Sequence, residues 1–145
     1  MDLKIKLLSP NAVLPQYATA GSAAMDLTAC IDEPVTLAPR QLAALPTGIA
    51  IALPSAEYVA LVFARSGLGV KHGISLSNGV GVIDSDYRGE IKVGLTNLSD
   101  EPYTIQPGDR VAQLAILPVT QAHVVQVEEL DETGRGAGGF GSTGK

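Results

Sequence analysis

Short apolar runs bounded by turn residues recur along the whole of this chain, and no long helical pattern interrupts them. The 16 glycines and 9 prolines disfavour helices and mark frequent turns. Many short strands at regular spacing predict a β-barrel or β-sandwich, with at most a helical turn at 66–71. We expect strands at 3–8, 35–37, 41–53 with a break at Pro46 and Gly48, 58–64, 74–76, 90–98, 103–105, 110–117 and 123–130.

Length and charge narrow the class of protein. A chain of 145 residues suits one domain with one core. The net charge of −5 disfavours stable nucleic-acid binding, which needs a basic surface. Cys30 is the only cysteine, so no intrachain disulfide is expected, which fits a reducing compartment. We expect a cytoplasmic protein without a membrane partner, because no targeting segment and no run of roughly 18 apolar residues is seen.

The segment 78–90 has the highest density of polar groups. Asn78-Gly79 predicts a tight hairpin turn, because both residues tolerate positive φ. Apolar strand residues precede Asp84, and a tyrosine, an arginine and two further carboxylates follow within six residues. This composition predicts the floor of a pocket for a small polar ligand. Asp84 taken alone is equally well explained as a turn aspartate.

Three other positions have polar side chains suited to binding an anion or a metal. Arg65-Ser66-Gly67 follows a predicted strand and indicates either a phosphate clamp or a strand-end salt bridge. Asp26 suits a magnesium ion held through water, although its own surroundings favour a solvated loop carboxylate. Gln113 suits a phosphate contact or a hydrogen bond in the core.

The last thirteen residues, 133–145, differ from the rest because six of them are glycine. Ordering such a segment costs about 1–2 kcal/mol per residue in backbone entropy, so we expect a single β domain over 1–132 and a mobile lid over 133–145. Arg135 and Phe140 in the lid need a partner to bind. The glycine spacing matches a dinucleotide fingerprint and most of a Walker A loop, but both motifs need a following helix, for which no residues remain.

Five segments in order resemble the motifs of the dUTP pyrophosphatases (dUTPases) of the homotrimeric, all-β type. They are residues 24–27, 65–68, 78–90, 108–114 and 135–144. The resemblance implies a jelly-roll-like all-β fold of many short strands with a flexible glycine-rich tail. It also implies hydrolysis of dUTP to dUMP and pyrophosphate with Mg²⁺, which limits uracil incorporation into DNA and supplies dUMP for thymidylate synthesis. The homotrimer would share three active sites, each tail closing over a neighbour's site.

The resemblance implies a role for each motif residue. Asp84 would activate the water that attacks the α-phosphorus. Asn78 and the backbone at Val82 and Ile83 would read uracil, and Tyr87 would pack on the deoxyribose. The remaining residues would hold the phosphates and their metal: Arg65, Ser66, Gly67 and Gln113 on the phosphates, Asp26 on the water shell of magnesium, Arg135 on the γ-phosphate, and Phe140 stacked on the base.

Three positions depart from the family pattern: Ala64 replaces a usual proline, Gly69 a usual alanine and Ala137 a common serine. None is a residue to which chemistry is assigned. Two alternatives remain open at this stage. One is a dCTP deaminase on the same fold, which would have Arg-Ser-Ser at 65–67. The other is a dUTP-sensing trimer without catalysis, which would release no pyrophosphate.

Overall fold

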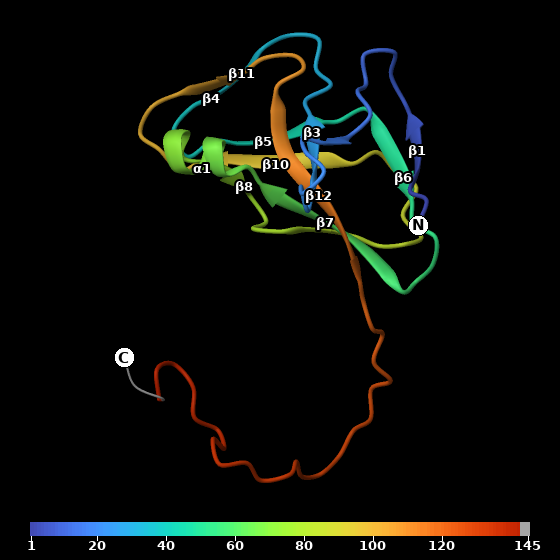
Figure 1. Ribbon diagram of the computed structural model, residues 1–145. Coiled ribbons are helices and arrows are strands. Elements are labelled where there is room, and N and C mark those ends of the chain that lie inside the picture. Colours follow the sequence, from blue (N-terminus) through green and yellow to red (C-terminus); the bar gives the residue numbers. More distant parts are fainter. Residues whose placement is uncertain (143–145) are drawn as a thin grey trace.

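The computed structural model describes residues 1–142, and within them the chain is all-β and jelly-roll-like, with one short helix (Figure 1). The helix α1 spans Ser66–His72. The strands are β1 (Lys4–Leu7), β2 (Gln16–Tyr17), β3 (Met25–Thr28), β4 (Val35–Leu37), β5 (Leu42–Pro46), β6 (Ile49–Ala52), β7 (Tyr58–Ala64), β8 (Ile74–Leu76), β9 (Gly81–Ile83), β10 (Lys92–Asn97), β11 (Tyr103–Ile105) and β12 (Arg110–Pro118).

The described strands form four antiparallel sheets. The largest has the order β2-β3-β12-β7-β9, and a three-stranded sheet has the order β5-β10-β8. The pairs β1-β6 and β4-β11 complete the described body. Because β12 lies between β3 and β7, it brings together residues that are far apart in the sequence. This central position of β12 organises the site described below.

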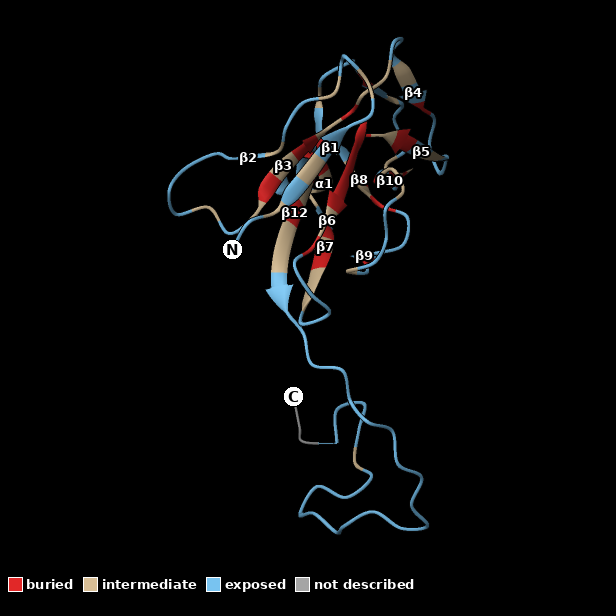
Figure 2. Ribbon diagram, turned by 90° about the vertical axis from the view of Figure 1, so that its right-hand side faces the viewer, coloured by how far each residue is buried: buried red, intermediate tan, exposed pale blue. Residues whose placement is uncertain are grey.

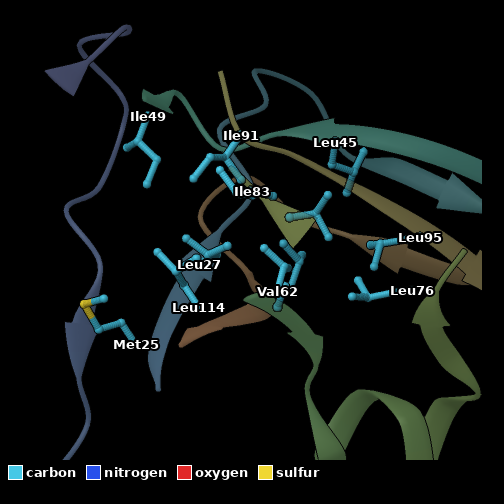
Figure 3. Close-up of a cluster of buried hydrophobic side chains, with 14 of the residues drawn as sticks. Met25, Leu27, Leu45, Ile49, Val62, Leu76, Ile83, Ile91, Leu95 and Leu114 are labelled. Carbon is cyan, nitrogen blue, oxygen red and sulfur yellow. The ribbon is translucent and has the colours of Figure 1, made fainter. Parts of the chain in front are cut away.

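The core lies between the large sheet and the three-stranded sheet, and Figure 3 shows its side chains pointing toward one another. Leu27 of β3 and Leu114 of β12 are buried on one side. Val93 and Leu95 of β10 are buried on the other, with Ile91 just before the strand. The alternation seen in the sequence at 91–95 therefore predicts the buried face of β10 correctly.

The helix α1 begins directly after β7 and ends at Gly73. Gly73 has a φ of +67°, and its N–H donates to the Gly69 carbonyl at 3.1 Å. A side chain at this position would lie 2.9 Å from Ser99, so both the conformation and the space require glycine. The described part of the chain contains no helix long and apolar enough to span a bilayer.

The predicted hairpin at Asn78-Gly79 is wrong. The turn itself forms, with a φ of +74° at Gly79 and a hydrogen bond of 3.2 Å from its N–H to the Leu76 carbonyl. The strands on either side of it do not pair, because β8 pairs with β10 and β9 pairs with β7. The turn therefore carries the chain from one sheet to the other, and packing against β7 and β10 overrides the local hairpin preference.

The strand expected at 123–130 is also wrong within this chain. Residues 119–142 extend away from the body and are almost entirely exposed (Figures 1 and 2). Val124, Val125 and Val127 are 89%, 66% and 55% exposed. The apolar pattern that predicts a strand is present, but the described residues provide no strand for it to pair with. Of the predicted lid, residues 143–145 lie outside the described part.

We expect Leu95→Ala to lower the free energy of unfolding by about 2–5 kcal/mol, because Leu95 is 1% exposed and its removal leaves a cavity. Leu98→Ala is the matched control, since Leu98 lies just beyond the same strand and is 55% exposed. Urea denaturation measures both. An equal loss of stability in the two variants would contradict this assignment of the core.

Candidate functional site

A carboxylate held by two arginines lies in the middle of the large sheet. The side chain of Asp26 is 13% exposed. Its Oδ1 accepts from Arg65 Nε at 3.1 Å and from Gln113 Nε2 at 3.4 Å, and its Oδ2 accepts from Arg110 Nη1 at 3.0 Å. The local sequence suggests a solvated loop carboxylate, and this interpretation is wrong. Asp26 lies in β3 and forms the centre of an ion-pair cluster.

The strand order explains how these residues meet. Gln113 of β12 lies directly opposite Asp26 of β3, and Arg65 is the first residue after β7 on the other side of β12. A shift of register between Arg110 and Ala112 accompanies the start of β12. Arg65 Nη1 also donates to the Arg110 carbonyl at 3.1 Å, which holds the two arginines together.

This cluster has a net positive charge, because one carboxylate faces two guanidinium groups. Arg65 is 24% exposed and Arg110 is 56% exposed, so both remain accessible to an anion. Ser66 and Gly67 follow Arg65 directly. A preorganised pair of arginines beside a hydroxyl and an uncrowded backbone is suited to binding phosphate oxygens. The structure thus supplies the strand-end salt bridge that the sequence suggested for Arg65, together with a cationic surface.

A separate cavity of about 450 Å³ lies where the chain crosses from the small sheet to the large one. Four of the predicted site residues line it: Asn78, Val82, Ile83 and Tyr87. Glu90 and Lys92 add polar groups to a wall that is otherwise apolar, with Val62 and Leu76 among its residues. This mixture is typical of a small-molecule site. The predicted pocket floor is therefore present, although no hairpin forms it.

Two backbone features fix the position of the Tyr87 ring. Its hydroxyl donates to the Glu90 carbonyl at 3.1 Å. A Cβ built on Gly89 would lie 2.3 Å from that hydroxyl oxygen, so any residue other than glycine would displace the ring. The ring therefore lies against the Gly89 backbone at the mouth of the cavity, where it is 46% exposed.

The charged residues next to Tyr87 do not pair with one another. Arg88 Nη1 donates to the carbonyls of Ser85 and Tyr87, at 2.7 and 2.9 Å. Glu90 Oε1 accepts the Gly48 N–H at 2.9 Å. Arg88 and Glu90 therefore do not pair with each other, because both side chains bind backbone groups instead.

Asp84 lies in a neighbouring hollow, of about 600 Å³, and not in the cavity itself. Asp86 and Ser85 line the same hollow, and Val82 lines both spaces. Asp84 is exposed, and its carbonyl accepts the Tyr87 N–H at 3.2 Å, which closes the loop between them. The three carboxylates thus do not converge, because Glu90 turns toward Gly48.

The tail residues lie apart from both groups. Arg135 Nε donates to the Gly138 carbonyl at 2.8 Å, within the tail itself, and the Phe140 side chain is fully exposed. His72 of α1 contacts Tyr103, with ring centroids 4.7 Å apart and ring planes tilted by 40°. Among residues 1–142, no cluster of three or more histidine, cysteine or acidic side chains could hold a metal by itself.

The family model for dUTPase matches residues 10–144. The chain belongs to the dUTPase family. A curated dUTPase, the deoxyuridine 5′-triphosphate nucleotidohydrolase of Idiomarina loihiensis, is 57% identical over 132 residues, which cover 91% of this chain and 87% of the relative. The enzyme of the same description from Neisseria meningitidis serogroup A is 51% identical over 146 residues, covering 99% and 97%.

Solved dUTPases share the fold over nearly the whole chain. A point mutant of the dUTPase from Staphylococcus bacteriophage 80alpha, with dUpNHpp, has a TM-score of 0.90 at 30% identity, covering 99% of both chains. A second solved structure is an aspartate-to-asparagine mutant of the dUTPase from phage phi11 of S. aureus, described with a structural Mg(II) ion. It has a TM-score of 0.82 at 27% identity and covers 91% of this chain and 100% of that chain. These dUTPases resemble the present chain in architecture as well as in sequence.

Sequence reasoning missed Arg110 as a member of the site. It lies in the dUTPase-like segment 108–114, but nothing in the local pattern shows that it reaches Asp26, which is 84 residues earlier. The strand order would have been needed to place it there. The segment 78–90 includes Glu90, but its sequence does not show that the Glu90 carboxylate accepts the Gly48 N–H.

We expect Asp26→Asn to lower the melting temperature by roughly 4–10 °C, because two guanidinium groups lose their shared counter-charge in a partly buried site. Asp100→Asn is the matched control. The Asp100–Arg40 pair has the same 3.0 Å contact, but its side chains are 91% and 66% exposed, so we expect little change. Scanning calorimetry measures the melting temperature of both variants. An equal decrease in the two would contradict the view that burial makes the Asp26 cluster stabilising.

Proposed function

We propose that this chain hydrolyses dUTP to dUMP and pyrophosphate, with the base bound in the Asn78–Tyr87 cavity and Asp84 activating the water. The observation that carries this is the arrangement of the cavity and the Asp84 hollow around the shared residue Val82, in a chain of the dUTPase family. The cavity and the exposed carboxylate of Asp84 therefore both adjoin Val82, near the end of β9. The reaction would keep dUTP low and supply dUMP.

Selectivity follows from the cavity. Asn78 has both a donor and an acceptor for a pyrimidine edge, and the backbone at Val82 and Ile83 adds further polar groups. A cytosine would leave some of these polar groups without a hydrogen-bond partner, and unpaired buried polar groups weaken binding strongly. Tyr87 is held against the Gly89 backbone and would pack on the sugar, where a 2′-hydroxyl would collide with the ring.

Asp84 would act as the general base. It accepts a proton from a water molecule while the water oxygen forms a bond to the α-phosphorus. The bond from the α-phosphorus to the α,β-bridging oxygen breaks, and pyrophosphate leaves with that oxygen. Such a displacement depends mainly on positioning and on neutralising charge. The exposed position of Asp84 in its hollow leaves it accessible to both water and phosphate.

Arg65, Ser66, Gly67 and Gln113 would bind the phosphates. Asp26 supports this role indirectly, because its carboxylate fixes the guanidinium of Arg65 and the amide of Gln113 before substrate arrives. Arginines already held in place lose less freedom on binding, which favours affinity. Arg110 pairs with the same carboxylate and would add positive charge beside the phosphates.

The residues of the phosphate-binding cluster fit a magnesium ion only if the substrate phosphates hold most of it. Asp26 is the single carboxylate in the phosphate-binding cluster, and both of its oxygens accept hydrogen bonds. A carboxylate oxygen has a second lone pair, so Oδ2 remains able to accept from a water of the ion. Mg²⁺ commonly keeps several waters and binds through one or two carboxylates and substrate phosphates. When bound, it would neutralise phosphate charge.

We further propose a homotrimer in which the active sites are shared between copies. The chain exposes 9722 Å², whereas a folded monomer of 15.0 kDa exposes about 7,000 Å². Much of the excess belongs to the extended tail, which is exposed along almost its whole length (Figure 2). Its exposed apolar residues include Val124, Val125 and Leu130. An assembly that covers the tail would remove this exposed surface.

The tail would close over the site of a neighbouring copy. Arg135 would bind the γ-phosphate and Phe140 would stack on the base, which is worth roughly 1–3 kcal/mol for an aromatic–base contact. The fully exposed phenylalanine then gains a partner. We assign the lid to residues 133–145 and the β domain to 1–132.

Asp84→Asn should abolish pyrophosphate release from dUTP while the affinity for a non-hydrolysable dUTP analogue stays within about threefold, because the amide keeps the shape but cannot take the proton. Asp86→Asn is the matched control, since Asp86 lines the same hollow and has no assigned role. The substrates dUTP, dCTP, dTTP and UTP are assayed with and without Mg²⁺. Binding of dUTP without turnover in the unmodified protein would favour the sensor alternative.

Truncation after Glu132 should leave the body folded and lower kcat/KM for dUTP by at least a hundredfold, because Arg135 and Phe140 are lost. Far-ultraviolet circular dichroism checks the fold, and a pyrophosphate-release assay checks activity. Phe140→Leu keeps the full length of the tail but removes the aromatic ring. It should therefore lower kcat/KM for dUTP by less than the truncation does. Normal hydrolysis by the truncated protein would contradict the assignment of the lid.

A further inference from the structure

The turn between β5 and β6 is bound to the two residues that follow the Tyr87 loop. Glu90 Oε1 accepts the Gly48 N–H at 2.9 Å. The Ile91 carbonyl accepts from the Thr47 N–H at 3.2 Å and from Thr47 Oγ1 at 2.6 Å, and the Ile91 N–H donates to the Ile49 carbonyl at 2.9 Å. We call residues 47–49 the anchor turn. It holds both a side chain and the backbone of the segment that lines the Asn78–Tyr87 cavity.

The anchor turn is itself closely packed. Gly48 is buried with a φ of +69°, and a Cβ built on it would lie 2.7 Å from both Ala12 Cβ and Cys30 Sγ. Its carbonyl accepts the Leu8 N–H at 2.7 Å, and Thr47 beside it is 2% exposed. A shift of this turn would break contacts with two other parts of the chain. The turn is therefore a rigid point to which residue 90 is attached.

Glu90 connects the anchor turn to the ring of Tyr87. Its carboxylate binds the Gly48 N–H, while its carbonyl accepts the Tyr87 hydroxyl at 3.1 Å. Gly89 lies between the two residues, and glycine allows the backbone unusual freedom. A bond that fixes residue 90 from its other side therefore limits how far its carbonyl, and the hydroxyl bound to it, can move.

We propose that Glu90 is a positioning residue that sets the preference for deoxyribose over ribose. The proposal rests on the proposed function, in which Tyr87 packs on the sugar. Glu90 acts through Tyr87, because its carboxylate is bound to the anchor turn. Groups that bind a ligand need supporting hydrogen bonds to hold their geometry. Without this one, the ring gains freedom to move aside for a 2′-hydroxyl, while Asp84 lies in a separate hollow and keeps its place.

Substrate selectivity gives the first test. Glu90→Ala should lower the ratio of kcat/KM for dUTP to kcat/KM for UTP at least fivefold, with kcat for dUTP within about threefold. Glu90→Gln should keep the ratio within twofold, because its amide oxygen still accepts the Gly48 N–H. Gln41→Ala is the matched control. Gln41 Oε1 also accepts a backbone N–H, that of Ala38 at 2.8 Å, but Gln41 does not line the cavity.

An unchanged ratio in Glu90→Ala overturns the proposal. If that variant does not fold, Glu90→Asp takes its place, since the carboxylate is kept but is one methylene too short to reach Gly48. We expect a smaller fall of the ratio in Glu90→Asp, of at least twofold. A ratio equal to that of the unmodified protein in this folded variant overturns the proposal as well.

The position of the ring can be followed without substrate. The chain contains four tyrosines, so protein made with 3-fluorotyrosine gives a fluorine NMR spectrum in which the Tyr87 resonance is assigned by its loss in Tyr87→Phe. Glu90→Ala should shift or broaden this resonance, whereas Glu90→Gln and Gln41→Ala should leave it in place. A Tyr87 resonance that is unchanged in Glu90→Ala overturns the proposal.

A double-mutant comparison separates a role through Tyr87 from a general weakening of the fold. Tyr87→Phe lacks the hydroxyl that binds the Glu90 carbonyl, so adding Glu90→Ala to it should change the dUTP/UTP ratio by less than twofold. A full further loss overturns the proposal.

Failure of the proposed function is distinguishable from failure of this one. If the unmodified protein does not hydrolyse dUTP, the dissociation constants of non-hydrolysable dUTP and UTP analogues replace the kinetic ratio. A loss of that binding preference in Glu90→Ala would then leave the positioning role standing without the hydrolysis. Normal hydrolysis with an unchanged ratio in Glu90→Ala would overturn the positioning role alone.

Discussion

The structure depends on one carboxylate that is shared by two arginines. Asp26 joins β3 to the end of β7 and to β12, and it fixes Arg65, Arg110 and Gln113 in one place. Without a negative charge at this point, the two guanidinium groups would repel each other in a partly buried position. The same interaction therefore stabilises the large sheet and arranges the groups that are suited to bind phosphate.

The sequence predicts most of the strands because their signals are local. The sequence predicts a strand at 58–64, and β7 has the same two ends. The predicted break at Pro46 and Gly48 separates β5 from β6. Proline and glycine act through their own backbone preferences, and apolar alternation reflects burial on one face. The sequence also predicts a pocket at 78–90, because the residues that line the cavity there are close together in the chain.

The remaining features depend on partners that lie far away in the sequence. Asn78-Gly79 fixes a turn, but it does not decide that β9 joins β7 while β8 joins β10. Nor does any local signal reveal that Asp26 meets Arg65 and Arg110, at separations of 39 and 84 residues. The segment 123–130 also shows that a local pattern cannot supply the partner of a strand. Its apolar pattern is real, but its partner is not found among the described residues of the same chain.

The glycine content of residues 133–145 limits how far this segment can order, which bears on its proposed role as a lid. Ordering thirteen residues costs about 1–2 kcal/mol each, whereas stacking of one aromatic on a base returns roughly 1–3 kcal/mol. An arginine–phosphate contact adds to this but does not close the difference. The lid would therefore order only in part, and only with nucleotide present, unless the chain before it is already held.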